Sequence, residues 1–143
     1  MSTVAQLLKS KQRHEIHSID SEEPVLEAIR QMAEHGIGAL LVMQGSRLAG
    51  IISERDYARK VILMGRSSSE TPVWQIMSSP VISVRPEQHI QDCMQLMTEK
   101  RVRHLPVVRD QQVVGVLSIG DLVRALLNEQ QQTIVQLESY IHS

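Results

Sequence analysis

The sequence predicts an α/β protein of two β-α-β-β-α repeats, packed sheet to sheet as one pseudo-twofold module. Three observations predict this fold class: the chain matches itself at a fixed offset, each copy mixes helical and strand patterns, and each copy is small. The chain has 143 residues, within the roughly 100–200 residues of one domain. A copy of about 55–60 residues has only a marginal core by itself, so we expect the two copies to bury their faces against each other.

The internal repeat appears at an offset of 65 residues, where residues 18–59 align on 83–124 without a gap. Gly50, Ser53 and Asp56 then fall on residues of the same type. Many other aligned pairs exchange one apolar side chain for another. A self-match of this length indicates two copies of one structural unit.

The first copy is expected to open with a short strand and an amphipathic helix. We expect the strand over Ile16–Ile19. Ser21 is expected as the helix N-cap, followed by acidic residues and Pro24 in the first turn, which are residues that helix starts favour. Apolar side chains recur at helical spacing up to Met32, and Gly36 is expected to end the helix.

A hairpin and a second helix complete the copy. Residues 39–43 form a continuous apolar run, which is typical of a buried strand. Leu48–Ile52 is expected to pair with it across the turn at Gln44–Ser46. Ser53 is expected to begin a helix that runs through Met64. The second copy repeats the same order of elements.

These elements divide the chain into segments. We expect the first repeat over 8–66 with a lead-in over 1–7, a linker and lead-in helix over 67–76, the second repeat over 77–130, and a C-terminal helical extension over 131–143. The last helix is expected to run from Leu122 to about Ile141. The apolar residues of its tail fall on one side, which indicates a surface for a partner.

The composition excludes several classes of protein. Lys and Arg number 15 against 16 Asp and Glu, a balance that argues against a nucleic-acid binder. No apolar run approaches the ~18 residues that a membrane span needs, and the N-terminus shows no export signal, so no membrane contact is expected. The single cysteine, Cys93, cannot form an internal disulfide, which favours a reducing, cytoplasmic location.

The most informative motif is G-h-h-S-x-x-D, where h is apolar, which begins at Gly50 in the first copy and at Gly115 in the second. It falls where a strand is expected to lead into a helix. One interpretation is structural: Ser at the N-cap and an acidic residue three positions later form a capping box. The other is functional, because a helix N-terminus attracts anions and a carboxylate beside it can accept hydrogen bonds from two adjacent hydroxyls. Phosphate and ribose together fit such a junction.

The chain resembles a stand-alone tandem CBS-domain protein, the cystathionine-β-synthase-type pair known as a Bateman module. The resemblance is carried by the repeat order, by the two motifs, and by the strand Arg103–Val108. It is also carried by the segment Val73–Met77 followed by Pro80–Val84. It spans the chain from about Val4 to Leu127.

This resemblance implies a regulatory module that binds adenosine-type ligands in two clefts between the repeats. AMP, ADP or ATP are the expected ligands, with NAD as a further possibility, and no metal is expected. In the family the Asp binds ribose, and the Ser helps to bind ribose or phosphate. Each cleft is expected to combine the motif of one repeat with strand residues of the other. The expected residues of the first cleft are Ser53, Arg55, Asp56, Ile82, Ser83, Arg103 and His104, with Ile51 as an apolar wall. Those of the second are Ser118, Asp121, His17, Ser18, Gly38 and Ala39, with Val116 as the wall.

The crossed arrangement makes the two clefts unequal. The Asp56 cleft gains Arg103, His104 and Arg55, cations that suit phosphate groups. The Asp121 cleft has small, uncharged residues at the matching places and is expected to be poorer in charge. We therefore expect the Asp56 cleft to prefer phosphorylated nucleotides.

Three functions remain open from the sequence. The leading one is a regulatory sensor of adenine nucleotides, and hence of cellular energy, that works as a homodimer on an unknown effector protein. The second is a ligand-free module for dimerisation or protein interaction, in which Ser-x-x-Asp is only a helix cap. The third is a sensor of NAD(H) or S-adenosylmethionine. No nucleophile–base pair or catalytic motif is present, so we expect no enzyme activity.

Overall fold

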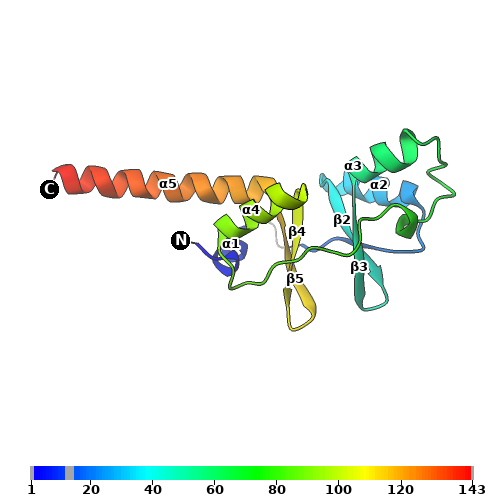
Figure 1. Cartoon of the computed structure of the whole chain (residues 1–143), viewed down its shortest axis with the longest axis horizontal. Helices are drawn as coiled ribbons and strands as arrows, with labels where there is room; N and C mark the ends of the chain where they lie inside the picture. Colours follow the sequence, from blue (N-terminus) through cyan, green and yellow to red (C-terminus); the bar gives the residue numbers. More distant parts are fainter. Residues whose placement is uncertain (1, 12–14, 143) are drawn as a thin grey trace. The chain divides into compact units, whose positions relative to one another are not determined.

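The computed structural model describes residues 2–11 and 15–142, which fall into two compact units (Figure 1). The repeat-1 unit is His17–Ile82. The repeat-2 unit combines Ser83–Ser143 with the N-terminal segment Met1–Ile16. Each unit therefore contains one copy of the sequence repeat, and each is described by itself below.

The repeat-1 unit is built on a three-stranded sheet in the order β1-β2-β3. β1 (Ser18–Asp20) runs parallel to β2 (Ala39–Gln44), and β2 pairs antiparallel with β3 (Arg47–Ser53). The helix α2 (Val25–His35) connects β1 to β2. After β3 the chain forms α3 (Glu54–Tyr57) and continues as the π-helical turn η1 (Ala58–Ile62). The short 3-10 helix η2 (Val73–Gln75) follows.

An aliphatic core holds this unit together, since the chain has no Phe. Every helix and strand of the unit except α3 contributes, together with Ile76 just after η2: Ile19, Val25, Ala28, Met32, Leu40, Val42, Ile52, Val61, Val73 and Ile76. The buried side of α2 is the face that the 3–4 spacing predicts. Val73 and Ile76 belong to the lead-in of the second copy, yet they complete the core of the first.

The repeat-2 unit has a two-stranded sheet in which β4 (His104–Arg109) pairs antiparallel with β5 (Gln112–Ser118). α4 (Ile90–Lys100) precedes the sheet, and α5 (Ile119–His142) follows it as one continuous helix (Figure 1). α1 (Val4–Ser10) belongs to this unit as well. The register repeats that of the first unit, because His104 faces Ser118 as Ala39 faces Ser53.

The glycine of each motif allows a lead-in segment to pack closely on its strand. A Cβ at Gly50 would lie 2.6 Å from Met77 Sδ and 2.9 Å from the Ser78 carbonyl oxygen. A Cβ at Gly115 would lie 2.7 Å from Leu8 Cδ2. Leu8 and Met77 directly follow the two lead-ins, so the chain at the end of each lead-in covers the glycine of the other copy.

The predicted fold class and most elements are confirmed, with local differences. Ser21 is not the N-cap of α2, which is Pro24. Instead the Ser21 amide donates to the Met43 carbonyl at 3.0 Å and the residue is buried, because a turn at Asp20 intervenes before the helix. The first strand of the second copy is reduced to a single bridge from Val84 to Val107. α5 begins three residues before the predicted Leu122.

Candidate functional site

Both G-h-h-S-x-x-D motifs form capping boxes at a strand-to-helix junction. In the repeat-1 unit, the Asp56 amide donates to Ser53 Oγ at 3.1 Å. The Ser53 amide and hydroxyl both donate to Asp56 Oδ2, each at 3.0 Å. These bonds satisfy amides that a helix start would otherwise leave unpaired. The structural interpretation of the motif is therefore correct, and the functional one must be compatible with it.

The second carboxylate oxygen of Asp56 faces a lysine and a lead-in serine. Lys60 Nζ lies 3.2 Å from Asp56 Oδ1, and Ser78 Oγ donates to the same oxygen at 3.3 Å. Lys60 also donates to the Ile76 carbonyl at 3.0 Å. The Asp56 side chain is 13% exposed and that of Lys60 is 45% exposed, so solvent or a ligand can reach the lysine side of the carboxylate.

The junction in the repeat-2 unit has the same box with more positive charge. The Ser118 amide donates to Asp121 Oδ2 at 2.8 Å, and the Asp121 amide donates to Ser118 Oγ at 3.1 Å. Lys11 Nζ lies 2.9 Å from Asp121 Oδ2 and also donates to the Val116 carbonyl at 2.7 Å. Arg124 donates to Asp121 Oδ1 at 2.9 Å.

These contacts set the ionisation of Asp121. Burial by itself raises the pKa of this carboxyl, but the Ser118 amide and the Lys11 ammonium outweigh it and hold the pKa below its ordinary value. Asp121 is thus an anion at neutral pH, with two cations on it. Among the described residues one cation contacts Asp56 and two contact Asp121, whereas the charge difference expected between the two complete clefts remains a prediction.

The other candidate residues of the repeat-1 unit lie on both sides of β2. Gly38 accepts a hydrogen bond from the Glu54 amide at 3.0 Å, and Ala39 is the sheet partner of Ser53. The unit thus brings these two residues to its own motif. His17 stacks on His35 with ring centroids 4.0 Å apart. The remaining candidates of this unit are partly buried or exposed: Ser18, Ile51, Arg55 and Ile82.

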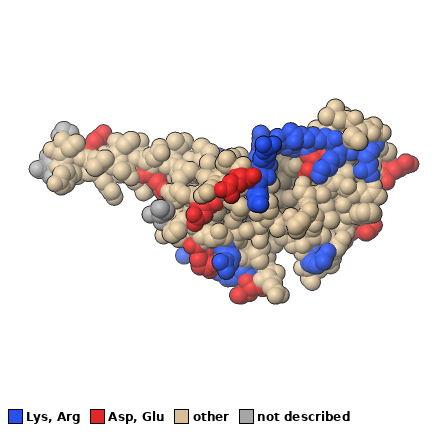
Figure 2. All heavy atoms as spheres, in the orientation of Figure 1, with Lys and Arg blue, Asp and Glu red and all other residues tan. Residues whose placement is uncertain are grey.

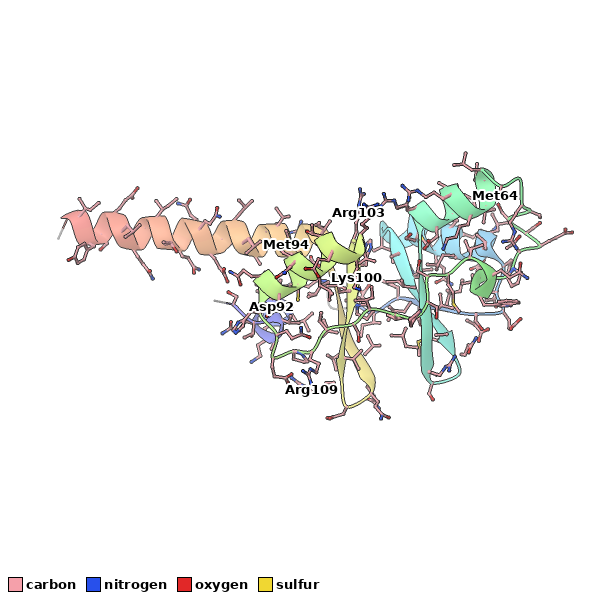
Figure 3. The ribbon with its side chains drawn as sticks, viewed as in Figure 1. Met64, Asp92, Met94, Lys100, Arg103 and Arg109 are labelled. Carbon is pink, nitrogen blue, oxygen red and sulfur yellow. The ribbon has the colours of Figure 1, made fainter. Side chains whose placement is uncertain are left out.

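In the repeat-2 unit the candidate residues gather at the matching place. The Arg103 carbonyl accepts from the Ile119 amide at 2.9 Å, and His104 is the sheet partner of Ser118. Arg103, labelled in Figure 3, is exposed where α4 leads into β4. Ser83 is exposed and Val116 is partly buried. The pairing of each motif with strand residues of the other repeat remains a prediction.

A shallow cavity of about 330 Å³ opens beside the first junction. The end of α2, the loop before β2 and the first residue of α3 line it: Ile29, Met32, Ala33, Gly36, Ile37, Gly38 and Glu54. Its wall is polar and apolar in about equal parts, with Glu54 among the lining residues. All the residues that line the cavity belong to the repeat-1 unit.

Three residues at these sites were missed by the sequence analysis. Lys60 lies four residues after Asp56, a helical spacing that brings side chains together, so a charge-pattern search would have found it. Lys11 and Ser78 reach their aspartates from the lead-ins, 110 and 22 residues away in sequence. No local pattern indicates such contacts.

Two further observations bear on the chemistry of the chain. Among the residues that the structure describes, no cluster of three His, Cys, Asp or Glu could hold a metal ion, and no helix could cross a membrane. Burial raises the pKa of the Cys93 thiol to about 11, with a smaller contribution from Asp92. A protonated, buried thiol is a poor nucleophile, and Cys93 is a small apolar side chain of the core.

The fold and the paired junctions define a CBS-domain pair, a module that is generally regulatory and ligand-binding. The CBS domain model matches residues 4–62 and 73–128, and the chain belongs to this family. It is 40% identical to the mitochondrial CBS domain-containing protein CBSX3 of Arabidopsis thaliana, over 98% of this chain and 72% of that protein. It is 31% identical to the CBS domain-containing protein YhcV of Bacillus subtilis, over 85% and 87%.

Solved structures agree in fold. A CBS-domain protein of Burkholderia ambifaria, proposed to act in signal transduction, is 50% identical with a TM-score of 0.87, over 90% of this chain and 96% of that one. The CBS pair of MJ0100, solved with 5′-methylthioadenosine and S-adenosylmethionine, is 24% identical with a TM-score of 0.78, over 90% and 98%. At that identity the second likeness concerns the fold alone.

Proposed function

We propose that the chain is a regulatory sensor that binds an adenosine-type ligand at its two Ser-x-x-Asp junctions. One observation carries the proposal: both repeats build the same partly buried aspartate at a helix start, with one oxygen turned to an exposed cation. Lys60 is 45% exposed and Arg124 is 70% exposed. A ribose diol can replace such an exposed partner while the capping box stays intact.

The cations at each junction suit a phosphate group. Lys60 in the first unit, and Lys11 and Arg124 in the second, would be released toward a phosphate as the ribose takes their place on the carboxylate, and Arg55, next to Asp56 in sequence, adds a further positive charge. AMP, ADP and ATP are therefore the ligands we favour. The MJ0100 pair, with a similar fold, was solved with adenosine derivatives, which supports an adenosine class and keeps NAD and S-adenosylmethionine as competitors.

The residues of the other repeat complete each site in this proposal. Arg103 and His104 would serve the Asp56 ligand, and His17 and Ser18 the Asp121 ligand. Replacing Arg103 with Ala should then weaken AMP more than adenosine. An equal loss for both would contradict a phosphate role for Arg103.

The rest of the functional proposal concerns the setting of the module. We infer a non-catalytic protein that works as a homodimer and changes the state of an effector protein. The single buried cysteine favours a reducing compartment, and we place the chain in the cytoplasm. Because the Arabidopsis relative is named mitochondrial, cell fractionation must test this location.

The experiment is thermal unfolding of nucleotide-free protein with AMP, ADP, ATP, NAD and S-adenosylmethionine in separate samples. A ligand present at 100 times its Kd stabilises the folded state by about 2.7 kcal/mol. For a chain of this size that is a rise of about 8 °C in Tm. Asp56→Asn and Asp121→Asn should each remove the rise due to their own site. Glu54→Gln, which removes a neighbouring negative charge outside the box, is the matched control.

The capping boxes favour a second candidate, a ligand-free interaction module, because every bond within them has a structural purpose. This candidate predicts no rise in Tm with any of the five ligands. A rise that survives both aspartate substitutions would also contradict the sensor proposal, since the ligand would then bind elsewhere.

A further inference from the structure

The outer part of α5 extends beyond the rest of its unit as an exposed rod (Figure 1). One stripe along the helix, the α5 seam, consists of Val123, Leu127, Gln130, Ile134, Leu137 and Ile141. Its five apolar members are between 41% and 74% exposed. The family model ends at residue 128, so most of the seam lies outside the part of the chain that the CBS model matches.

The spacing of the seam is that of a coiled coil. Its members follow one another at intervals of 4, 3, 4, 3 and 4 residues, the alternation that keeps one side chain per turn against a partner helix. Over these residues the helix is about 27 Å long. Leu122, on a different side of α5, is fully buried within the unit. The seam is therefore a second apolar face, in addition to the one that the unit already covers.

The charges indicate what kind of partner fits. After Arg124 the helix carries Glu129 and Glu138 but no Lys or Arg, and Figure 2 shows acidic but no basic atoms on the visible face of its outer half. A helix that lies on an anionic membrane needs basic residues along its polar face. The uncharged seam instead fits another helix with the same spacing, and a second copy of α5 supplies one without opposing like charges across the seam.

We propose that the α5 seam pairs with the α5 seam of a second copy as a parallel two-stranded coiled coil. The orientation follows from the seam residues. Leu127, Ile134 and Ile141 take the a positions and Leu137 a d position, and Ile at a with Leu at d favours two strands in a parallel coiled coil. In a parallel pair the two Gln130 amides meet and can hydrogen-bond each other, whereas in an antiparallel pair each Gln130 would face Ile134.

This pairing places the ligand junction and the dimer contact on one helix, since α5 begins directly after Ser118. The proposal rests on the homodimer inferred above but not on nucleotide binding. Its tests therefore use the full chain without nucleotide.

The first test is sedimentation velocity over a hundredfold range of protein concentration. The wild-type chain should associate to a dimer, and the double variant Ile134→Asn, Leu137→Asn should remain a monomer where the wild type is dimeric. Val135→Asn is the matched control, because Val135 is 54% exposed but lies off the seam. A wild-type monomer at every concentration would refute both the dimer and the seam. Equal dimerisation of wild type and double variant would refute the seam alone.

The second test determines orientation by disulfide trapping. Leu137→Cys should form an intermolecular disulfide on mild oxidation, because two d positions of one layer meet in a parallel pair. The wild-type chain, whose single Cys93 is fully buried, is the control. If Leu137→Cys stays reduced while a mixture with Leu127→Cys forms the mixed disulfide, the helices are antiparallel and the proposed pairing is wrong.

Discussion

Substituting the motif glycines tests whether they are there for packing. A Cβ at Gly50 would overlap Met77 Sδ at 2.6 Å and also the Ser78 carbonyl oxygen at 2.9 Å. The side chain of Met77 can move, but the Ser78 carbonyl is fixed by paired bonds with Ile51 of 2.8 and 3.1 Å. Gly50→Ala must therefore displace backbone, and we expect a loss near the upper end of overpacking costs, about 2–3 kcal/mol.

The methyl group added by Gly115→Ala would meet only a side chain that can move. This Cβ would overlap only the far end of Leu8, at 2.7 and 3.1 Å, and a changed rotamer costs about 1 kcal/mol. Gly120→Ala is the control within the same motif, because its Cβ meets nothing closer than 3.4 Å. There alanine should stabilise the helix by about 0.5–1 kcal/mol.

Thermal unfolding followed by circular dichroism measures all three variants. At about 3 °C per kcal/mol, Gly50→Ala should lower Tm by about 6–9 °C and Gly115→Ala by about 3 °C, while Gly120→Ala should raise it slightly. If Gly50→Ala were neutral, or cost less than Gly115→Ala, close packing of the lead-ins would not be the reason for these glycines.

Three further predictions concern single groups. The pKa of Asp121 is depressed in the folded state, so its contribution to stability is full above the unfolded-state pKa and is lost as pH falls through the folded-state pKa. Between neutral and acidic pH, the urea midpoint should therefore fall less steeply for Asp121→Asn than for wild type. Parallel curves for the two proteins would contradict this. With a pKa of about 11, Cys93 should react with a thiol reagent far more slowly in native protein than in urea, and equal rates would show an accessible thiolate. Ser53→Ala removes a cap hydroxyl and should cost about 1 kcal/mol in chemical denaturation, whereas no change would mean that the box is not formed in solution.

The sequence predicted the two junctions well because their interactions are local. Ser53 and Asp56 are three residues apart, so the strand before them and the helix after them are enough to define the box. At the same offset of 65 residues, Arg101 stands where Gly36 ends α2. Both residues do adopt the left-handed conformation, with φ of 55° and 64°, although arginine adopts it less readily than glycine.

The interactions that the sequence did not predict depend on tertiary packing. Ser21 has the residue type of an N-cap, but its amide donates to the Met43 carbonyl on a neighbouring strand. Pairing with the sheet therefore overrides the preference of serine for a helix start. Lys11 reaches Asp121 because α1 joins the repeat-2 unit through hydrogen bonds from Val4 to Gln88 and from Ala5 to Pro86, at 2.8 and 2.9 Å. No spacing rule within a repeat contains that information.

The contact of Ser78, from the start of the second repeat, with Asp56 in the first repeat affects ligand binding. Asp56 already accepts four hydrogen bonds or charged contacts, two at each oxygen, from Ser53, Ser78 and Lys60. A carboxylate has about four acceptor positions, so a ribose cannot simply add to this site and must replace existing partners. The measured affinity then depends on how much stronger the contacts of the carboxylate with the ribose are than the contacts with the protein partners that the ribose replaces.

That difference favours the Asp56 site over the Asp121 site. At Asp56 the ligand can displace Lys60, an i, i+4 partner that is half exposed and contributes little as a surface pair. At Asp121 the ligand can displace the exposed Arg124 from Oδ1, but it must compete for Oδ2 with Lys11, which is only 21% exposed and also donates to the Val116 carbonyl. Lys11→Met should therefore strengthen adenosine binding at the Asp121 site, measured by calorimetry in an Asp56→Asn background. A loss of adenosine affinity would show that Lys11 binds the ligand instead of competing with it.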